Sequence, residues 1–242
     1  MEFARFRPLI EALPIKTEYS KDELRTNRFL LFSDSGLDVY YIPFHYLNRE
    51  ARVVLVGLTP GWTQMHNAFV AAKRGLIDGL SGDNLFRFIE KYGGFSGSVM
   101  RTNLISMLNA IGLDGCVGIP SCSKLFEDTD RLAHFTSAIS APVFRDGKNY
   151  TGRTPALLQV KALRDFAKLN LAKELAALPD AVIIPLGQVA GEVVQFLGKE
   201  KLISLDRCLR GFPHPSGASG RRPQLFRGGC ERWRSELAKW FR

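Results

Sequence analysis

The chain has 242 residues, of which 45% are hydrophobic, 24% charged and 11% aromatic, and its formal net charge is +9. This balance is typical of a globular protein with a buried core and excludes a disordered chain. The sequence has neither an apolar run that could span a bilayer nor a signal-peptide core near its N-terminus, so we expect a cytoplasmic protein without membrane contact. Because no repeat or long linker divides it, we expect a single domain over 1–242, with a helical and strand extension over 1–50.

Strand-like and helix-like patterns alternate along the chain. The runs 52–57 and 181–186 are continuous and apolar, as expected of central parallel strands covered on both faces. The expected elements in chain order are a helix over 3–13, strands over 39–42 and 52–57, a loop through 64–67, helices over 82–92 and 98–111, a strand over 133–139, a helix over 155–178, a strand over 181–186, a helix over 188–197, a strand over 203–209 and a helix over 231–241. This alternation predicts an α/β fold with a layered, mostly parallel sheet.

Two loops stand out, 57–66 and 211–222, and both are expected at the carboxyl ends of strands, where sites in such sheets collect. The first loop opens with the run Gly57-Leu58-Thr59-Pro60-Gly61-Trp62. A strand that stops on Gly-x-x-Pro-Gly presents a tight, rigid turn whose backbone can approach a ligand closely. By itself this run favours an ordinary strand-to-helix turn.

The second loop is more specific. It contains the run His214-Pro215-Ser216-Gly217-Ala218-Ser219-Gly220-Arg221-Arg222. Two prolines bracket His214 and fix the backbone around it, and the small, then basic, stretch that follows suits backbone approach and phosphate contact. A core histidine is the alternative, but the polar, glycine-rich flanks favour a functional site.

The positive charge is concentrated near the end of the chain. Residues 206–242 hold nine Lys/Arg and three Asp/Glu, which gives 9 − 3 = +6 of the total +9. Such a segment attracts polyanions, nucleic acid first among them, although a solvated basic helix is an equal alternative on charge alone. Of the four cysteines, only Cys116 and Cys122 lie near each other, so we expect reduced thiols and no metal site.

Taken together, the two loops resemble motifs of the uracil-DNA glycosylase superfamily. The 57–61 run looks like its Gly-x-(Asp/Asn/Ala)-Pro-(Tyr/Gly/Ala) turn, and His214-Pro215-Ser216 looks like the start of its (His/Asn)-Pro-Ser-x-x-Ser motif. The segments 182–190 and 95–113 resemble its strand–Leu-Gly-x-x-Ala–helix unit and its helix ending in Ile-Gly-Leu. The match runs over 50–240 in the right order.

The resemblance implies a three-layer sandwich around a central, mostly parallel four-stranded sheet. It implies a monomeric, monofunctional DNA glycosylase whose partner is DNA and which needs no cofactor. Such enzymes flip a nucleotide into a pocket, where water replaces the base at the sugar. His214 then hydrogen-bonds the O2 of the leaving base. Thr59 stands in the place of the family's water-activating Asp or Asn, but a hydroxyl is a poor base, so either Thr59 only orients the water or another group acts.

The resemblance also predicts a base pocket, made by Gly57, Leu58, Pro60, Gly61, Trp62, Phe86 and Ser137. Gly61 stands where the uracil-specific branch has a Tyr that excludes substituents at C5, so we expect C5-modified pyrimidines to be accepted, with uracil as the other candidate substrate. Ser137 stands where the family has an Asn that reads the pyrimidine edge. Trp62 and Phe86 are the candidates for stacking on the flipped base.

The predicted DNA contacts come from the second loop: Ser216, Gly217, Ala218, Ser219, Arg221 and Arg222. Ala218 falls near the position of the family's wedge and is too small for that role, so Arg221 or Arg222 fills the gap in the duplex or contacts phosphate. The modified base suggests repair or defence against phage DNA. A non-catalytic DNA-binding member of the same fold is the alternative, and a nucleotide enzyme ranks last because no glycine-rich phosphate loop accompanies the strands.

Overall fold

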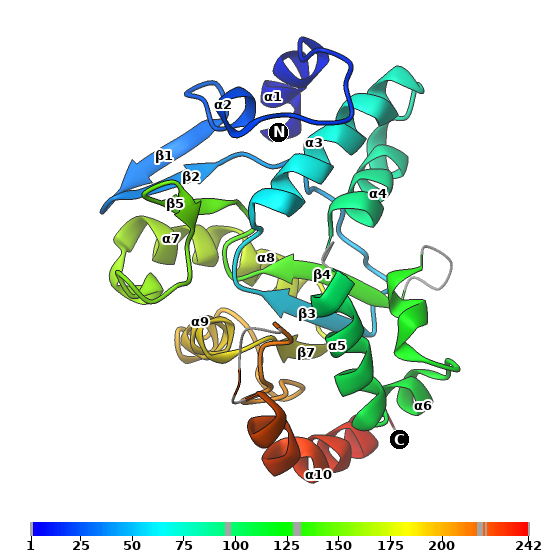
Figure 1. The fold of residues 1–242 in the computed structure, drawn as a ribbon. Helices are drawn as coiled ribbons and strands as arrows, with labels where there is room; N and C mark the ends of the chain where they lie inside the picture. Colours follow the sequence, from blue (N-terminus) through cyan, green and yellow to red (C-terminus); the bar gives the residue numbers. More distant parts are fainter. Residues whose placement is uncertain (1, 95–97, 128–131, 217–219, 221, 242) are drawn as a thin grey trace.

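The structure is a computed structural model that describes residues 2–94, 98–127, 132–216, 220 and 222–241. It is an α/β fold, as predicted, and contains two separate sheets (Figure 1). The parallel sheet consists of β3 (Val53–Gly57), β4 (Ala133–Ser137) and β7 (Val182–Pro185), in the order β4-β3-β7. All of β3 and β7 is buried, as the continuous apolar runs predicted.

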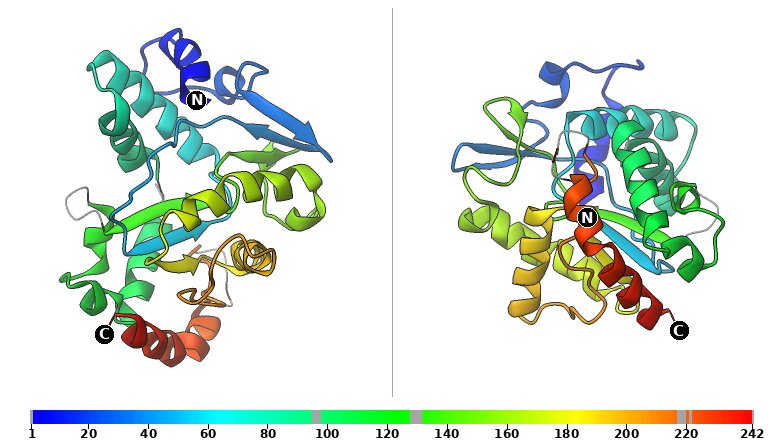
Figure 2. Two further views of the ribbon diagram at one scale, coloured as in Figure 1. Left: turned by 180° about the vertical axis from the view of Figure 1, so that it is seen from behind. Right: turned by 60° about the horizontal axis from the view of Figure 1, so that its bottom comes forward.

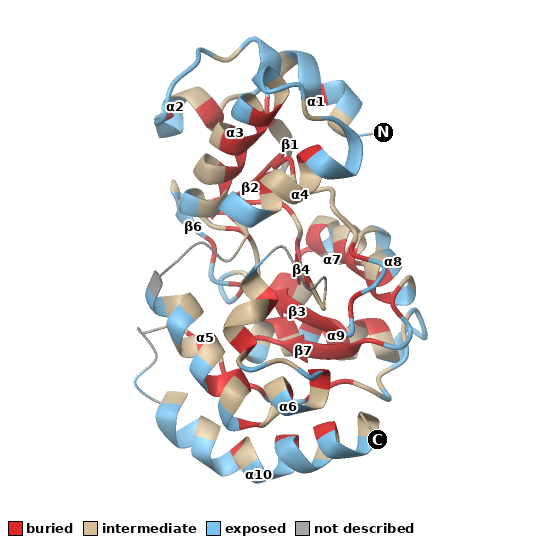
Figure 3. Cartoon of the chain, turned by 90° about the vertical axis from the view of Figure 1, so that its right-hand side faces the viewer, coloured by how far each residue is buried: buried red, intermediate tan, exposed pale blue. Residues whose placement is uncertain are grey.

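Helices cover both faces of the parallel sheet (Figures 1 and 2). Val54 and Val56 face a cluster that contains residues of α7 (Lys161–Leu169), α8 (Leu171–Ala176) and α9 (Gln188–Lys199). Val53 and Leu55 face the other cluster, which contains residues of α5 (Ser98–Ala110), α6 (Leu113–Val117) and α10 (Arg222–Trp240). Figure 3 shows β3 and β7 buried between these helices, with much of α10 exposed.

The expected fourth strand over 203–209 is not present, so the parallel sheet has three strands. This segment contacts β7 through one isolated parallel bridge, Ile183 to Cys208, in which Ile183 N donates to Arg207 O at 2.8 Å and Leu209 N donates to Ile183 O at 2.9 Å. A turn precedes it, since Cys208 N donates to Leu205 O, and Gly211 follows with a φ of +72°. The turn and the left-handed residue leave too short an extended stretch for a strand.

The second sheet is antiparallel and was not predicted. It consists of β1 (Leu30–Asp34), β2 (Leu37–Tyr40), β5 (Val143–Arg145) and β6 (Lys148–Asn149), in the order β1-β2-β5-β6. Its hairpins turn at Ser35-Gly36 and Asp146-Gly147, where all four residues have positive φ. Two such residues in succession match the twist of antiparallel strands, and Asp-Gly is a strong hairpin signal that sequence analysis could have used.

The expected loop through 64–67 is wrong, because a helix, α3 (Trp62–Ile77), begins directly after Gly61. Its start is capped by Gln64, whose Oε1 accepts the Gly61 N–H at 3.1 Å. Met65, Phe69 and Ala72 bury one face of α3 against the antiparallel sheet, in a cluster that also contains residues of α1 (Glu2–Glu11), α2 (Lys21–Leu24) and α4 (Gly82–Gly93). The helical spacing of these apolar residues was the missed signal.

Two other helices differ from their predicted bounds. The single helix expected over 155–178 is divided into a short 3₁₀ helix (Leu157–Gln159), α7 and α8, and the Asn170 amide between the last two donates to Phe166 O at 2.9 Å. The last helix begins at Arg222 rather than at 231. Gly229, inside this helix, is a close contact of the Trp233 ring, where a side chain would clash. Within the described ranges, no helix combines the length and apolar character needed to cross a bilayer.

Acidification is expected to destabilise the protein through His45. This imidazole accepts or donates a 3.0 Å hydrogen bond with the Tyr41 hydroxyl and lies 5.4 Å from the Phe86 ring, and burial lowers its pKa from 6.5 to about 4. Below pH 6.5 the unfolded chain therefore binds a proton that the folded protein does not. The free energy of unfolding should fall by up to about 3 kcal/mol between pH 6.5 and 4.

Urea unfolding of wild type and His45→Gln across this range measures the effect. The variant should lose less stability than wild type as the pH falls, because glutamine does not titrate. If the free energy of unfolding falls equally with pH in the two proteins, groups other than His45 cause the acid sensitivity.

Candidate functional site

The carboxyl edge of the parallel sheet brings together the two loops that the sequence singled out. Gly57 and Ser137 are register partners at the ends of β3 and β4, and Ala138 N donates to Gly57 O at 2.8 Å. On the other side of β3, Gly187 follows β7, and its N–H donates to Phe212 O at 2.9 Å. The 57–61 loop, the end of β4 and the His214 loop therefore share one edge, as the topology predicted.

His214 is held as a neutral hydrogen-bond donor. The Ser216 N–H donates to its Nδ1 at 3.1 Å, so the proton of the neutral ring is on Nε2. Burial lowers the pKa of His214 below its ordinary value of 6.5. At neutral pH the imidazole is thus uncharged, and Nε2 can donate to an acceptor at the sheet edge.

The backbone around His214 is fastened by two side chains that come from neighbouring helices. Asn103 of α5 and Arg222 of α10 each donate to Pro215 O at 2.9 Å, and Arg222 also donates to Ser216 O at 2.9 Å. Sequence analysis assigned Arg222 to DNA and did not find Asn103. In the structure, Nη1 of Arg222 is committed to the loop itself, while Gly217, Ala218, Ser219 and Arg221 lie outside the described residues.

Gly187 has no side chain, and His214 occupies the space that a side chain there would need. It has a φ of +92° and a ψ of 174°, and a Cβ placed on it would lie 2.9 Å from the His214 Cβ. This backbone region is almost exclusive to glycine. The glycine of the Leu-Gly unit is thus a positioning residue for the histidine, a role that only the juxtaposition of two distant segments reveals.

The 57–61 loop is partly buried and contains a hydrogen bond between two neighbouring residues. Leu58 and Thr59 are half-buried and Pro60 is buried, and the Thr59 hydroxyl donates to Pro60 O at 3.1 Å. The lone pairs of that hydroxyl can still accept a hydrogen bond from a water molecule.

An unpredicted residue, Asn149 of β6, reaches this loop. Its Oδ1 accepts the Trp62 N–H at 3.1 Å, and its Nδ2 lies 3.0 Å from where a Cβ of Gly61 would be. The space expected to be open beside Gly61 therefore contains a polar amide. The asparagine was missed because the hairpin that carries it was not predicted.

A pocket lies beside β4, between the strand and helices α3, α4 and α8. Its walls include Pro60 and Ser137, two members of the predicted base pocket, and it encloses about 450 Å³ of empty space, its open mouth included. Phe44, Tyr46 and Phe135 supply its aromatic surface. We call it the Ser137 pocket.

The two predicted stacking residues are not among the residues that line the Ser137 pocket. Trp62 packs against His66, with their ring centroids 6.0 Å apart. Phe86 packs against Phe3, at 5.0 Å, within the N-terminal aromatic cluster. The residues that supply aromatic walls instead come from the extended segment after β2 and from β4.

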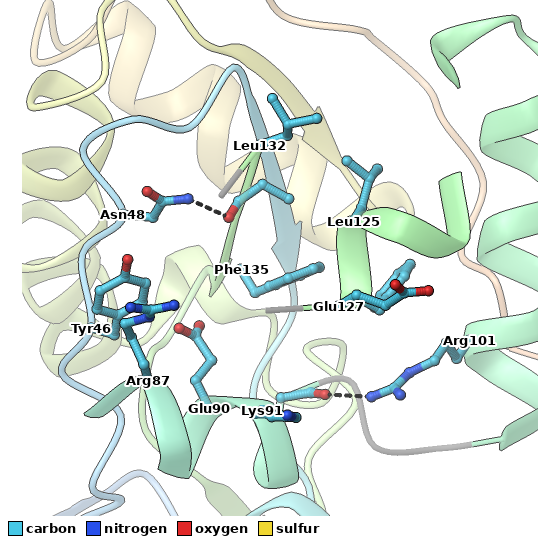
Figure 4. Close-up of a pocket in the computed structure, with 13 residues that line it drawn as sticks. Tyr46, Asn48, Arg87, Glu90, Lys91, Arg101, Leu125, Glu127, Leu132 and Phe135 are labelled. Carbon is cyan, nitrogen blue, oxygen red and sulfur yellow. Dashed lines mark hydrogen bonds between the residues drawn. The ribbon is translucent and has the colours of Figure 1, made fainter. Parts of the chain in front are cut away.

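A second pocket continues along the same strand and shares Tyr46, Glu90, Gly94 and Phe135 with the first (Figure 4). Its basic members are Arg87, Lys91 and Arg101. Arg101 donates to Gly94 O at 3.1 Å and lies over the Phe126 ring at 5.2 Å, and burial lowers its pKa. Two pockets that share lining residues therefore border β4, and the second carries cationic and aromatic groups.

Cys116, Cys122, Cys208 and Cys230 are free thiols, and burial raises the pKa of Cys122 and of Cys208 to about 12. Within the described parts of the chain, no group of three His, Cys, Asp or Glu side chains is placed to hold a metal ion.

The fold and the site define an α/β protein with a polar site at the carboxyl edge of three parallel strands. No family model matches the chain, and no solved structure matches it. The chain is 38% identical over 223 residues to the uncharacterized protein YoxB of Bacillus subtilis (strain 168), which covers 91% of this chain and 86% of YoxB. It therefore belongs to the same family as YoxB.

Proposed function

We propose that the protein is a monofunctional DNA glycosylase, a divergent relative of the uracil-DNA glycosylases, that removes a flipped pyrimidine. The observation that carries this proposal is His214. Its ring is neutral, its Nδ1 accepts the Ser216 N–H at 3.1 Å, and its loop lies at the same sheet edge as the 57–61 turn. A fixed, uncharged donor is the group that a departing pyrimidine anion requires.

The reaction breaks the bond between the sugar C1′ and the base nitrogen, and its electron pair leaves with the base. The sugar approaches an oxocarbenium ion in the transition state. His214 Nε2–H donates to O2 of the base, and this bond strengthens as negative charge develops there. Water adds to C1′ and releases a proton, which balances the charge of the departed base anion and is taken up by it in the end. Thr59, whose hydroxyl proton is directed to Pro60 O, accepts a hydrogen bond that orients the water.

A C5-modified pyrimidine is the substrate class that this site suits best. Gly61 carries no side chain, and the group that faces it is the amide of Asn149 rather than an aromatic ring. An amide can hydrogen-bond a polar substituent such as a hydroxymethyl group. Such bases occur in modified phage DNA, so repair or defence against foreign DNA is the proposed role.

Oligonucleotides with one test base each would test the proposed reaction directly. Single strands and duplexes would carry uracil, mismatched thymine, or a C5-modified cytosine or uracil, and hot alkali would cleave the chain wherever a base has been removed. We expect cleavage of at least one C5-modified substrate. If no oligonucleotide with any of these test bases is cleaved although DNA is bound, the glycosylase proposal fails.

A second candidate is a DNA-binding protein of the same fold without catalysis. The observation that favours it is the 57–61 loop, which offers Thr59 but no carboxylate to activate water. In that case modified DNA would be bound, and the base would remain attached after long incubation. The same oligonucleotide assay separates the two candidates.

Replacing Arg222 is expected to separate loop positioning from charge. Arg222→Ala removes both bonds to the His214 loop and one positive charge, so base release and DNA affinity should both fall. Arg222→Lys keeps the charge but replaces the planar guanidinium, whose Nη1 donates to both carbonyls, with a shorter side chain that ends in a tetrahedral ammonium group. We expect it to retain DNA affinity and its salt dependence while base release stays at least about 10-fold below wild type.

The measurements are single-turnover rates and affinities at several salt concentrations. Full recovery of base release in Arg222→Lys would show that the charge, and not the fastening of the loop, matters.

A further inference from the structure

A buried polar cluster lines the wall of the Ser137 pocket. Thr136 and His134, two residues apart on β4, contact the same oxygen of Glu174 on α8: the Thr136 hydroxyl donates to Oε2 at 2.5 Å, and His134 Nε2 lies 3.4 Å from it. His134 is 2% exposed, whereas the Glu174 side chain is 27% exposed. The carboxylate is thus held from behind and faces the pocket.

The groups that this cluster presents are acceptors. Neither of the two contacts uses Glu174 Oε1. The Oε1 oxygen of Glu174 calls for a ligand that donates an N–H group.

We propose that the Ser137 pocket reads an exocyclic amino group, so that the base removed is a cytosine-type pyrimidine rather than a uracil-type one. This inference rests on the proposed glycosylase function and names its substrate class. Glu174 accepts from the N4 amino group of that base.

The C4 substituent distinguishes the two pyrimidines at this wall. Cytosine has an amino group there, which donates to a carboxylate in the contact that Asp and Glu make with cytosine elsewhere. Uracil and thymine have a carbonyl oxygen at C4, and a carboxylate repels it. Ser137 and Ser140 hydroxyls, which also line the pocket, can donate or accept and so do not favour either base.

The experiment compares two duplexes that differ only at C4. Each carries one non-cleavable 2′-fluoroarabino nucleotide, with 5-hydroxymethylcytosine in one and 5-hydroxymethyluracil in the other, and affinity is measured by fluorescence anisotropy. Wild type should bind the cytosine duplex about 5- to 100-fold more tightly. Glu174→Gln, which is isosteric and offers a donor, should reduce this preference to less than about 3-fold or reverse it.

Glu200→Gln is the matched control, since this exposed glutamate pairs with Lys168 away from the pocket and should leave the preference unchanged. Far-ultraviolet circular dichroism and a melting curve of each variant establish that it is folded. If Glu174→Gln does not fold, the wild-type preference and competition by free cytosine and free uracil decide the question.

The proposal is overturned if wild type binds the uracil duplex equally or more tightly, if it binds neither more tightly than unmodified DNA, or if folded Glu174→Gln keeps the wild-type preference. Its failure is distinct from failure of the glycosylase function. Release of uracil-type bases alone would overturn the cytosine assignment and support glycosylase chemistry. A Glu174-dependent preference without base release would support the pocket assignment and contradict catalysis.

Discussion

Base release by the His214→Ala variant is expected to be at least about 100-fold slower than by wild type, with DNA affinity changed by only a few fold. The imidazole donates to charge that is largest in the transition state, and losing one such donor costs about 100- to 1000-fold in rate. Binding of the flipped base in its ground state depends less on this bond. Single-turnover rates together with anisotropy titrations separate the two effects.

The control is His66→Ala, because both ring nitrogens of this half-buried histidine are hydrogen-bonded to other residues of the fold. Its Nε2 accepts the Tyr19 N–H at 3.2 Å, and its Nδ1 lies 2.9 Å from Asn67 Oδ1. Folded His66→Ala should keep the wild-type rate. A wild-type rate in His214→Ala would contradict the role that the proposed mechanism gives to His214.

The same mechanism predicts how the rate responds to pH. Since burial lowers the pKa of His214, the neutral donor form persists to lower pH than it does in a free imidazole. Base release should therefore fall as the pH is lowered, with a midpoint below pH 6.5. A rate that rises as His214 becomes protonated would indicate an imidazolium acid instead.

Gly187→Ala is expected to reduce base release by on the order of 100-fold, although no atom of Gly187 takes part in the reaction. The new methyl group would lie 2.9 Å from the His214 Cβ, so the histidine must move. A displacement of about 1 Å at a reacting group costs roughly 100-fold in rate. The positive φ adds about 1–3 kcal/mol of backbone strain, which a melting curve measures.

Gly191→Ala is a matched control on the same helix. No atom lies within 4 Å of a Cβ at Gly191, and its φ is not in the left-handed region. Alanine should stabilise α9 by about 0.5–1 kcal/mol and leave the rate unchanged. If Gly187→Ala were as active as Gly191→Ala, His214 would not need its present position.

The sequence by itself determined the strands of the parallel sheet and the place of the candidate site. Continuous β-branched runs are buried on both faces wherever they fold, and parallel strands end at the same edge, so the convergence of the 57–61 and His214 loops followed from local pattern and topology. The helix after Gly61 and the two hairpins were also encoded locally, in the spacing of Met65, Phe69 and Ala72 and in Asp146-Gly147. Those signals were present but were not used.

Only the tertiary structure decided which side chains meet at the site. Asn149 reaches Trp62 across 87 positions, Asn103 reaches Pro215 across 112, and Glu174 reaches Thr136 across 38. The periodicity of one segment does not predict such pairings, because they depend on how helices and hairpins pack around the sheet. The same packing places Phe86 in the aromatic cluster with Phe3, whereas Phe44 and Tyr46 line the pocket. The position of an aromatic side chain depends on the surface that its segment covers.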